Sequence, residues 1–464
     1  MDTDTRTRRV VETEPRASLR STLPDSPRRV PRKRSVATLV VSIALCLCTT
    51  FWLTQASIAA LQRGPESDIV RQWVVTKYVL HGDDPYELAS DILRERTAAR
   101  VHQSAPFFAI PKSVTGKAAD RVLNPYGAPE ATYPPPAVGL LALLIGWLRT
   151  PDQVLALWLG VNAIALGTVV WLLTKTFGHR PPWTPIPNCV ATLTLLALFS
   201  PTYYAIANGQ FSLLVLACVL LGVQRGVNES LAGLASGLAL IKPSISLPFL
   251  LMDIALRRWK RVAIAISFQA ALMIGVAIGV HRNPLSLVHE WLNVSQYFLS
   301  GMYTLQELIN VCGLRGTPLA TVITATALGT IAVTIYAFRQ RPPIDLMAFV
   351  GVASALWMYH HYYDFVMHIP GVMVVLGWGS TRQDPRPRTW KLAIIAVPSF
   401  LALSAALTPH VIFAEGILAR SLRWSGRVSI SVLLGVLIVR LVRRRERPPQ
   451  TITMAPNRAS TMPN

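Results

Sequence analysis

Long apolar runs recur along most of the chain, and they restrict its fold more than any other feature. Most runs have about 15 to 25 residues, which is long enough for an α-helix to cross a bilayer. A membrane β-barrel would instead alternate apolar and polar residues in segments of about ten, and this chain does not. The runs lie at about residues 36–61, 137–148, 152–173, 188–206, 209–224, 231–251, 262–280, 317–338, 343–359, 362–379, 390–408 and 427–442.

The composition agrees with a membrane protein. The chain is 52% hydrophobic and only 15% charged, whereas soluble domains usually carry about 25% charged residues. The five cysteines form no paired spacing in a polar loop, so neither a disulfide framework nor a zinc site is indicated. The sequence therefore predicts an all-α, polytopic membrane protein with about ten to thirteen membrane segments.

Positive charge lies mainly between the apolar runs and at the two ends of the chain, and the formal net charge is +21. In a soluble protein such charge suggests a nucleic-acid partner. Here it orients helices, because Lys and Arg favour the cytoplasmic side, so no nucleic-acid partner is expected. Residues 1–35 and 446–464 have no apolar periodicity, which predicts disordered cytoplasmic tails. Residues 36–445 then form one multi-pass domain of the cell membrane, with both chain ends cytoplasmic.

The same orientation places the two longest polar stretches, 62–133 and 281–316, outside the cytoplasm. The first contains two helical patterns, from about Ile69 to Leu80 and from Glu87 to about Val101. A loop this long is usually functional or disordered. Its helical patterns and aromatic residues favour a functional loop.

Two apolar stretches, 188–224 and 231–256, fit the topology only as hairpins. Their outer turns would hold Asn208-Gly-Gln210 and Lys242-Pro243. Broken helices are tolerated at membrane depth where protein or a wet cavity satisfies their backbone. The pattern therefore predicts an internal site that opens outward.

Asp68 and Lys242 are the leading candidates for that site. Asp68 follows the first apolar run and lies at the membrane rim, although it could simply be an N-cap, because Asp is favoured there. Lys242 is an ionisable residue in apolar surroundings, which marks a functional site by default. Its alternative is a lysine that extends to the membrane interface.

Two further clusters fall on the outer side. His360 and His361 adjoin aromatic residues typical of a membrane interface, but Asp364 follows one helical turn later, which favours function. The segment from Asp83 to Tyr86 has the chemistry of a structural turn, because Asp before Pro favours one. No compelling metal cluster is present, although Asp68 with Asp364 could hold a divalent ion.

The order of these motifs resembles the GT-C glycosyltransferases of family GT87, which are mannosyl- and arabinofuranosyltransferases of the actinobacterial envelope that use polyprenyl-phosphate sugars. The resemblance covers residues 36 to 260 by motif and the remainder by topology. The chain departs from it at Arg71-Gln-Trp73, where members often have a Tyr, and at Phe211-Ser212, where they often have an apolar residue and Asn. The motifs are Asp68-Ile-Val, Gly82-Asp-Asp-Pro-Tyr86, Tyr133-Pro-Pro135, Asn208-Gly-Gln210 and Lys242-Pro243.

The resemblance implies a GT-C-like fold and inverting transfer of mannose or arabinofuranose, without a cofactor, outside the cytoplasmic membrane. The donor would be a polyprenyl-phosphate-linked sugar and the acceptor a glycan or glycolipid, within membrane lipids. Asp68 matches the family's catalytic acidic position and would be the general base. The candidates for binding the donor phosphate are Lys242, His360, His361 and Arg71. The candidates for orienting sugar or acceptor are Asn208, Gln210, Asp84, Tyr86 and Asp364.

A transporter or a flippase of lipid-linked saccharides is the alternative function. Transporters also have broken helices and polar residues near the bilayer midplane. The sequence shows no internal repeat, and one long outer loop is poorly suited to a symmetric carrier.

Overall fold

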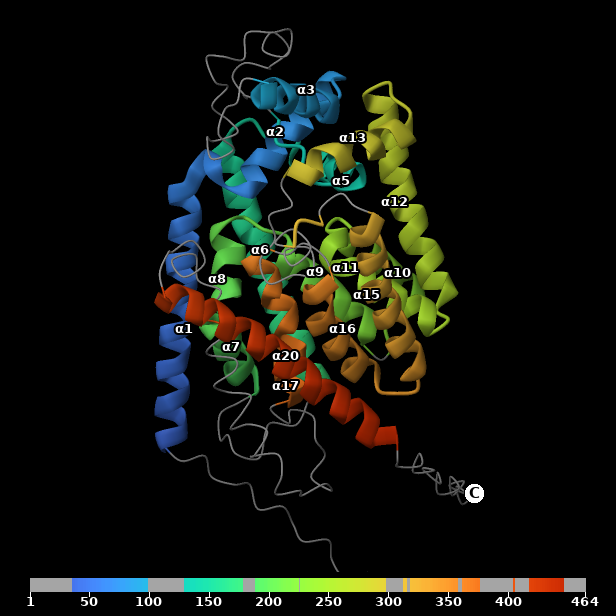
Figure 1. Cartoon of the computed structure of the whole chain (residues 1–464). Coiled ribbons are helices and arrows are strands. Elements are labelled where there is room, and N and C mark those ends of the chain that lie inside the picture. Colours follow the sequence, from blue (N-terminus) through green and yellow to red (C-terminus); the bar gives the residue numbers. More distant parts are fainter. Residues whose placement is uncertain are drawn as a thin grey trace, which may run out of the picture.

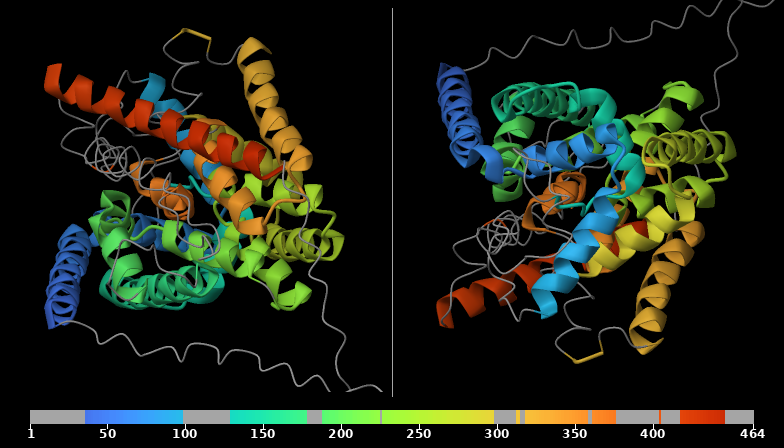
Figure 2. Two further views of the ribbon diagram at one scale, coloured as in Figure 1. Left: turned by 90° about the horizontal axis from the view of Figure 1, so that it is seen from below. Right: turned by 90° about the horizontal axis from the view of Figure 1, so that it is seen from above.

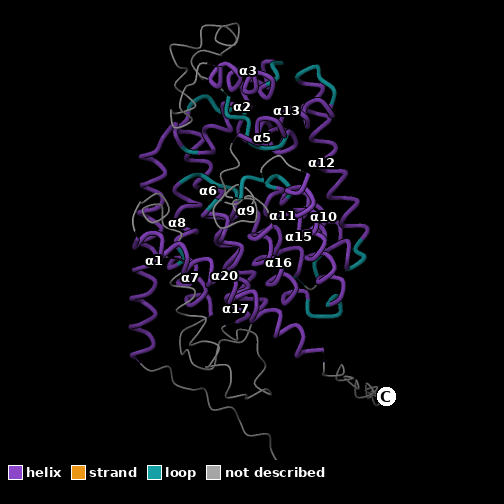
Figure 3. The backbone as a smooth tube through the Cα atoms, viewed as in Figure 1, coloured by secondary structure: helices purple, strands orange, loops and turns teal. Residues whose placement is uncertain are grey.

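The computed structural model describes residues 36–98, 129–177, 188–224, 226–297, 312–314, 318–357, 361–375, 404 and 417–445. These residues are almost entirely helical and contain no strand, which confirms the all-α class (Figure 3). The elements are α1 (Val36–Arg63), η1 (Gly64–Glu66), α2 (Asp68–His81), α3 (Pro85–Ala98), α5 (Pro135–Ile145), α6 (Pro151–Phe177), α7 (Asn188–Leu198), α8 (Ser200–Ala207), α9 (Ser212–Val223), α10 (Glu229–Ala239), α11 (Pro243–Ala255), α12 (Trp259–Gly279), α13 (Pro284–Tyr297), α15 (Pro318–Ala337), α16 (Pro343–Trp357), η2 (Tyr362–His368), α17 (Ile369–Val375) and α20 (Ile417–Arg445).

The helices form an upright bundle with α1 at one edge and α12 at the other (Figure 1). Helices α2, α3, α5 and α13 gather at one end, so the two polar stretches predicted outside the cytoplasm meet there. Helix α1 begins at the opposite end, where α20 also ends (Figure 1). Seen along the bundle, α20 lies across it, whereas α1 is viewed nearly end-on (Figure 2).

Both helices predicted in the first polar stretch are present, as α2 and α3. Helix α2 ends at His81 and is followed by Gly82, whose φ of 86° is the left-handed conformation that glycine adopts readily. Helix α3 starts at Pro85, which suits a first helical position because proline lacks an N–H. The turn between them thus follows directly from the local sequence.

Three described helical segments are long and apolar enough to cross a membrane: Thr38–His81, Pro151–Phe177 and Trp259–Gly279. The bent pair α7 and α8 would add a fourth if it is one broken span. Most other apolar runs form shorter helices, and the run 390–408 lies outside the described residues apart from position 404. The number of ten to thirteen membrane segments therefore stays a prediction.

Several predicted runs are interrupted inside the bundle. The run 188–206 bends by 73° between α7 and α8, and proline at position 201 cannot supply the N–H that a continuous helix needs. The run 231–251 breaks between α10 and α11, just before Pro243. The run 362–379 begins as the 3₁₀ helix η2. These interruptions place polar residues at helix ends instead of on lipid-facing surfaces.

Candidate active site

Asp68 is the first residue of α2, one residue beyond the turn that follows α1. Ser67 occupies the N-cap position, so the interpretation of Asp68 as the N-cap is wrong. The backbone N–H of Asp68 donates to the Asn208 carbonyl at 3.0 Å, and the Tyr363 hydroxyl reaches Asp68 Oδ2 at 3.4 Å. The carboxylate is half-buried and lies among three segments that are far apart in the sequence.

The turn Asn208-Gly-Gln210 joins α8 to α9 beside the start of α2. Asn208 Nδ2 donates to the Tyr362 hydroxyl at 2.9 Å, and Arg63 donates to Asn208 Oδ1. Both ends of the Asn208 amide are thus bound within the protein. Asn208 therefore holds the turn, and its role in orienting a sugar stays a prediction.

Gly209 has a φ of 64°, and a Cβ at this position would lie 2.7 Å from Ile69 Cγ2. Gly209→Ala should therefore destabilise the protein by about 2 to 4 kcal/mol, from left-handed strain and overpacking together. Gly226 is the matched control, because its φ is 80° and a Cβ there would meet nothing within 4 Å. Gly226→Ala should cost only about 1 kcal/mol. Equal thermal unfolding midpoints of the two variants in detergent would contradict this prediction.

Lys242 lies in the break before α11 and points into the bundle. Its Nζ is 2.5 Å from Asp364 Oδ1 and 3.1 Å from Gln210 Oε1. The ring of Tyr363 lies 4.5 Å from the same nitrogen. Ser212 also donates to Asp364 Oδ1, at 2.5 Å. Lys242 and Asp364 are only 8% and 1% exposed, so the interpretation of Lys242 as an interfacial lysine is wrong.

The orientation of the Gln210 amide is fixed by its two partners. Lysine has N–H donors only, so the amide oxygen must face Lys242. The Tyr133 hydroxyl also donates to this oxygen, at 2.9 Å. The Gln210 NH₂ group therefore faces away from both partners, as a hydrogen-bond donor.

Arg71 pairs with Glu130, a residue that the sequence analysis did not select. Their closest atoms, Arg71 Nη1 and Glu130 Oε2, are 3.1 Å apart. Burial raises the pKa of Glu130 to about 7, Arg71 opposes this rise, and Asp68 adds to it. The only sequence signal was position, since Glu130 is the single acidic residue between Asp120 and Asp152.

Asp84 and Tyr86 support the first outer loop. Asp84 Oδ1 accepts the backbone N–H of Tyr86 at 2.9 Å and that of Glu87 at 3.2 Å, which caps α3. Burial raises the pKa of Asp84, against the hydrogen bonds to its carboxylate and the charge of Arg282. The buried Tyr86 donates to the Tyr133 carbonyl at 2.8 Å. These contacts agree with a structural turn.

His361 is half-buried beside Tyr363, with ring centroids 4.9 Å apart. Its backbone N–H donates to Asp364 Oδ2 at 3.2 Å. His360 lies outside the described residues. In the part of the chain that the structure describes, no three His, Cys, Asp or Glu side chains group as metal ligands.

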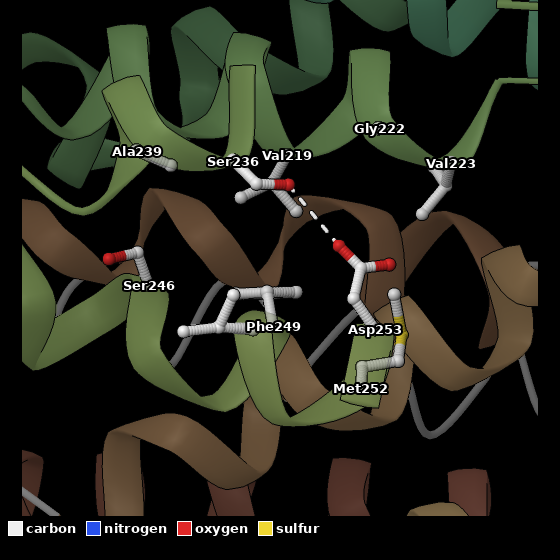
Figure 4. A pocket seen from close by; sticks show the side chains of 10 residues that line it. Val219, Gly222, Val223, Ser236, Ala239, Ser246, Phe249, Met252 and Asp253 are labelled. Carbon is white, nitrogen blue, oxygen red and sulfur yellow. Dashed lines mark hydrogen bonds between the residues drawn. The ribbon is translucent and has the colours of Figure 1, made fainter. Parts of the chain in front are cut away.

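A small cavity lies between α9, α10 and α11, where Asp253 accepts a hydrogen bond from Ser236 at 3.2 Å (Figure 4). Asp253 also pairs with Arg258 at 3.1 Å. The cavity has a volume of about 10 Å³, which suits about one water molecule. It is too small for a sugar, so the polar cluster around Lys242 and Asp68 is the better candidate site.

Helices of membrane length and polar residues buried at helix breaks define an integral membrane protein with an internal polar site. Residues 131–359 match the model of glycosyltransferase family 87. The match confirms the family that the motifs predicted, and the protein is a glycosyltransferase of this family. The matched segment includes Gln210 and Lys242, whereas Asp68 and Asp364 lie outside it. No curated protein and no solved structure matches the chain significantly.

Proposed function

We propose that the protein transfers mannose or arabinofuranose from a polyprenyl phosphate to an envelope glycan or glycolipid, outside the cytoplasmic membrane, with Asp68 as general base. One observation carries the proposal. A single residue, Tyr363, contacts both a carboxylate and an ammonium: its hydroxyl is 3.4 Å from Asp68 Oδ2 and its ring is 4.5 Å from Lys242 Nζ. The reaction needs these two groups, one for the acceptor proton and one for the departing phosphate.

In the proposed reaction, an acceptor hydroxyl attacks the anomeric carbon as the bond to the phosphate oxygen breaks. Asp68 takes the hydroxyl proton, and the polyprenyl phosphate leaves with the bonding electron pair. A single displacement of this kind inverts the anomeric configuration. Lys242 stabilises the negative charge that develops on the phosphate, because a fixed cation in a buried site interacts strongly with it.

The remaining roles follow from the contacts around these two groups. The NH₂ group of Gln210, which faces away from Lys242 and Tyr133, can donate to a sugar hydroxyl, and His361 is a second candidate for the phosphate. Asp364 holds Lys242 in position through their 2.5 Å ion pair. Arg71 is bound to Glu130, so we do not assign it to the donor phosphate.

The arrangement of the bundle supports an extracytoplasmic site. Asp68 follows α1 at the end of the bundle where the helices of the two polar stretches gather, and α1 begins at the opposite end (Figure 1). The basic residues around 31–34 and 440–447 favour cytoplasm for both chain ends. A sugar donor on the outer side is then lipid-linked, because nucleotide sugars are cytoplasmic.

The test compares donors. Washed membranes with the protein should transfer labelled mannose or arabinofuranose from the polyprenyl phosphate to an endogenous acceptor, and membranes without it should not. Transfer from the corresponding nucleotide sugar alone, with lipid-linked donors absent, would contradict the donor class. If the protein transfers neither lipid-linked mannose nor lipid-linked arabinofuranose, the proposal that it moves one of these two sugars is wrong. Lipid and glycan profiles of a deletion strain should show a truncated acceptor, which identifies the bond formed.

A further inference from the structure

A short non-helical segment, residues 130–133, leads from the first outer loop into the site. Three helices hold its backbone, because each supplies a side-chain donor to one of its carbonyl groups. With its carbonyls fixed, the segment directs Glu130 to Arg71 and Tyr133 to Gln210. The three hydrogen bonds are Gln72 Nε2 of α2 to the Glu130 carbonyl at 3.1 Å, Trp291 Nε1 of α13 to the Thr132 carbonyl at 3.0 Å, and the Tyr86 hydroxyl of α3 to the Tyr133 carbonyl at 2.8 Å.

Within the described part of the chain, Arg71 is the cation that most strongly affects Asp68. It lies three residues after Asp68 on α2, and side chains at this spacing are neighbours on a helix. Its charge acts on the Asp68 carboxylate more than those of Lys242 and Arg63. A guanidinium bound directly to this carboxylate would occupy oxygens that the acceptor hydroxyl needs, because arginine donates two parallel hydrogen bonds to carboxylates.

We infer that Glu130 is a positioning residue that acts through Arg71. By binding the guanidinium at 3.1 Å, it keeps Arg71 from pairing with Asp68 and leaves that carboxylate open to the acceptor hydroxyl. The Glu130 side chain is only 12% exposed, so the pair is little screened by solvent. This inference rests on the proposed role of Asp68 as general base.

The role of Glu130 depends on its ionisation. Burial raises the pKa of Glu130 to about 7. The positive charge of Arg71 lowers this pKa, and the negative charge of Asp68 raises it. Among the residues that the structure describes, Arg71 and Asp68 are the charged groups that act on Glu130. The described contacts from α3 and α13 to its segment come from the neutral Tyr86 and Trp291. Above about pH 7 the ionised Glu130 holds Arg71. Below it, the neutral acid holds Arg71 less strongly, so the transfer rate should rise with pH through this region.

The test measures sugar transfer by the full-length protein in membranes between about pH 5.5 and 8.5. Glu130→Gln should remove the inflection near pH 7 and lower kcat at pH 8 by about 10- to 100-fold, as expected when a catalytic group is misplaced. The KM for the lipid-linked donor should change by less than about twofold, because donor binding does not use Glu130. Glu130→Asp should retain an inflection.

A double variant separates this role from a structural one. If Arg71 is what blocks Asp68, then Arg71→Met in the Glu130→Gln background should restore kcat by about fivefold or more, because contacting residues are coupled. Trp291→Phe is the matched control: it removes one hydrogen bond from the same segment and leaves the Glu130 carboxyl, so the inflection should remain.

The outcomes distinguish this inference from the proposed function. An unchanged inflection in Glu130→Gln would overturn the inference, as would a double variant no faster than Glu130→Gln. Either result leaves the transferase reaction and Asp68 intact. A wild-type protein that transfers no lipid-linked sugar would overturn both.

Discussion

Asp68→Asn should lower sugar transfer by about 10²- to 10⁴-fold, the usual loss when a general base is removed. The asparagine side chain has nearly the same shape as aspartate and can still accept from the Tyr363 hydroxyl. The backbone hydrogen bond from residue 68 to the Asn208 carbonyl is also retained. The variant should therefore accumulate in the membrane like the wild type and differ only in its inability to take a proton. Initial transfer rates normalised to the amount of membrane protein measure the loss.

Tyr363→Phe is the companion variant for Asp68. It removes the hydroxyl that lies 3.4 Å from Asp68 and keeps the ring beside Lys242. Loss of one hydrogen bond to a charged group should raise the activation free energy of sugar transfer by about 1.5 to 3 kcal/mol. This corresponds to a transfer rate that is about 10- to 200-fold lower. If Asp68→Asn transfers sugar as fast as the wild type, Asp68 is not the base. Movement of a lipid-linked saccharide across the membrane without any transfer would instead favour a flippase.

Lys242→Ala should both destabilise the protein and abolish efficient donor use. The substitution leaves Asp364, which is 1% exposed, as a buried carboxylate without its 2.5 Å partner. Breaking a buried ion pair in this way usually costs about 3 to 5 kcal/mol. Lys242→Arg keeps the positive charge and should impair donor use less than alanine does. Thermal unfolding in detergent and the KM for the lipid-linked donor measure the two effects separately.

A double variant that replaces both charged residues by neutral ones separates the effect of Lys242 on folding from its effect on donor binding. Lys242→Met together with Asp364→Asn removes both charges, so no unpaired charge stays buried and the unfolding midpoint should return toward that of the wild type. Transfer should remain low, because no ammonium is left for the phosphate. Normal donor kinetics in this double variant would show that the ion pair only supports the fold.

Much of the local structure could be predicted from residues that are close in sequence. The turn between α2 and α3 depends on Gly82 and on Asp84 before Pro85, and the break before α11 on Pro243. These features arise from backbone conformation and capping within a few residues, which sequence patterns describe well. Helix α2 was also predicted, and its first residue differed by one position from the expected Ile69.

The partners of the site residues could not be predicted in this way. Glu130 has no local feature beyond its position before a proline run, yet it contacts Arg71 59 residues earlier. In the sequence, Tyr363 has the surroundings of an aromatic membrane interface. In the structure its hydroxyl contacts Asp68, which is 295 positions earlier in the chain. Such contacts depend on how helices pack, which one sequence without its tertiary structure does not specify.

The sequence by itself determined the class of protein and which residues could take part in chemistry. Apolar runs of bilayer length require helices, because only a helix satisfies its own backbone in lipid, and polar residues within those runs mark a site. The tertiary structure decided how these residues are paired: Lys242 with Asp364 over 122 positions, and Asp68 beside Tyr363 and the turn at Asn208. The physical reason is that capping and helix formation depend on neighbours in the chain, whereas the charge and orientation of a buried group depend on neighbours in space.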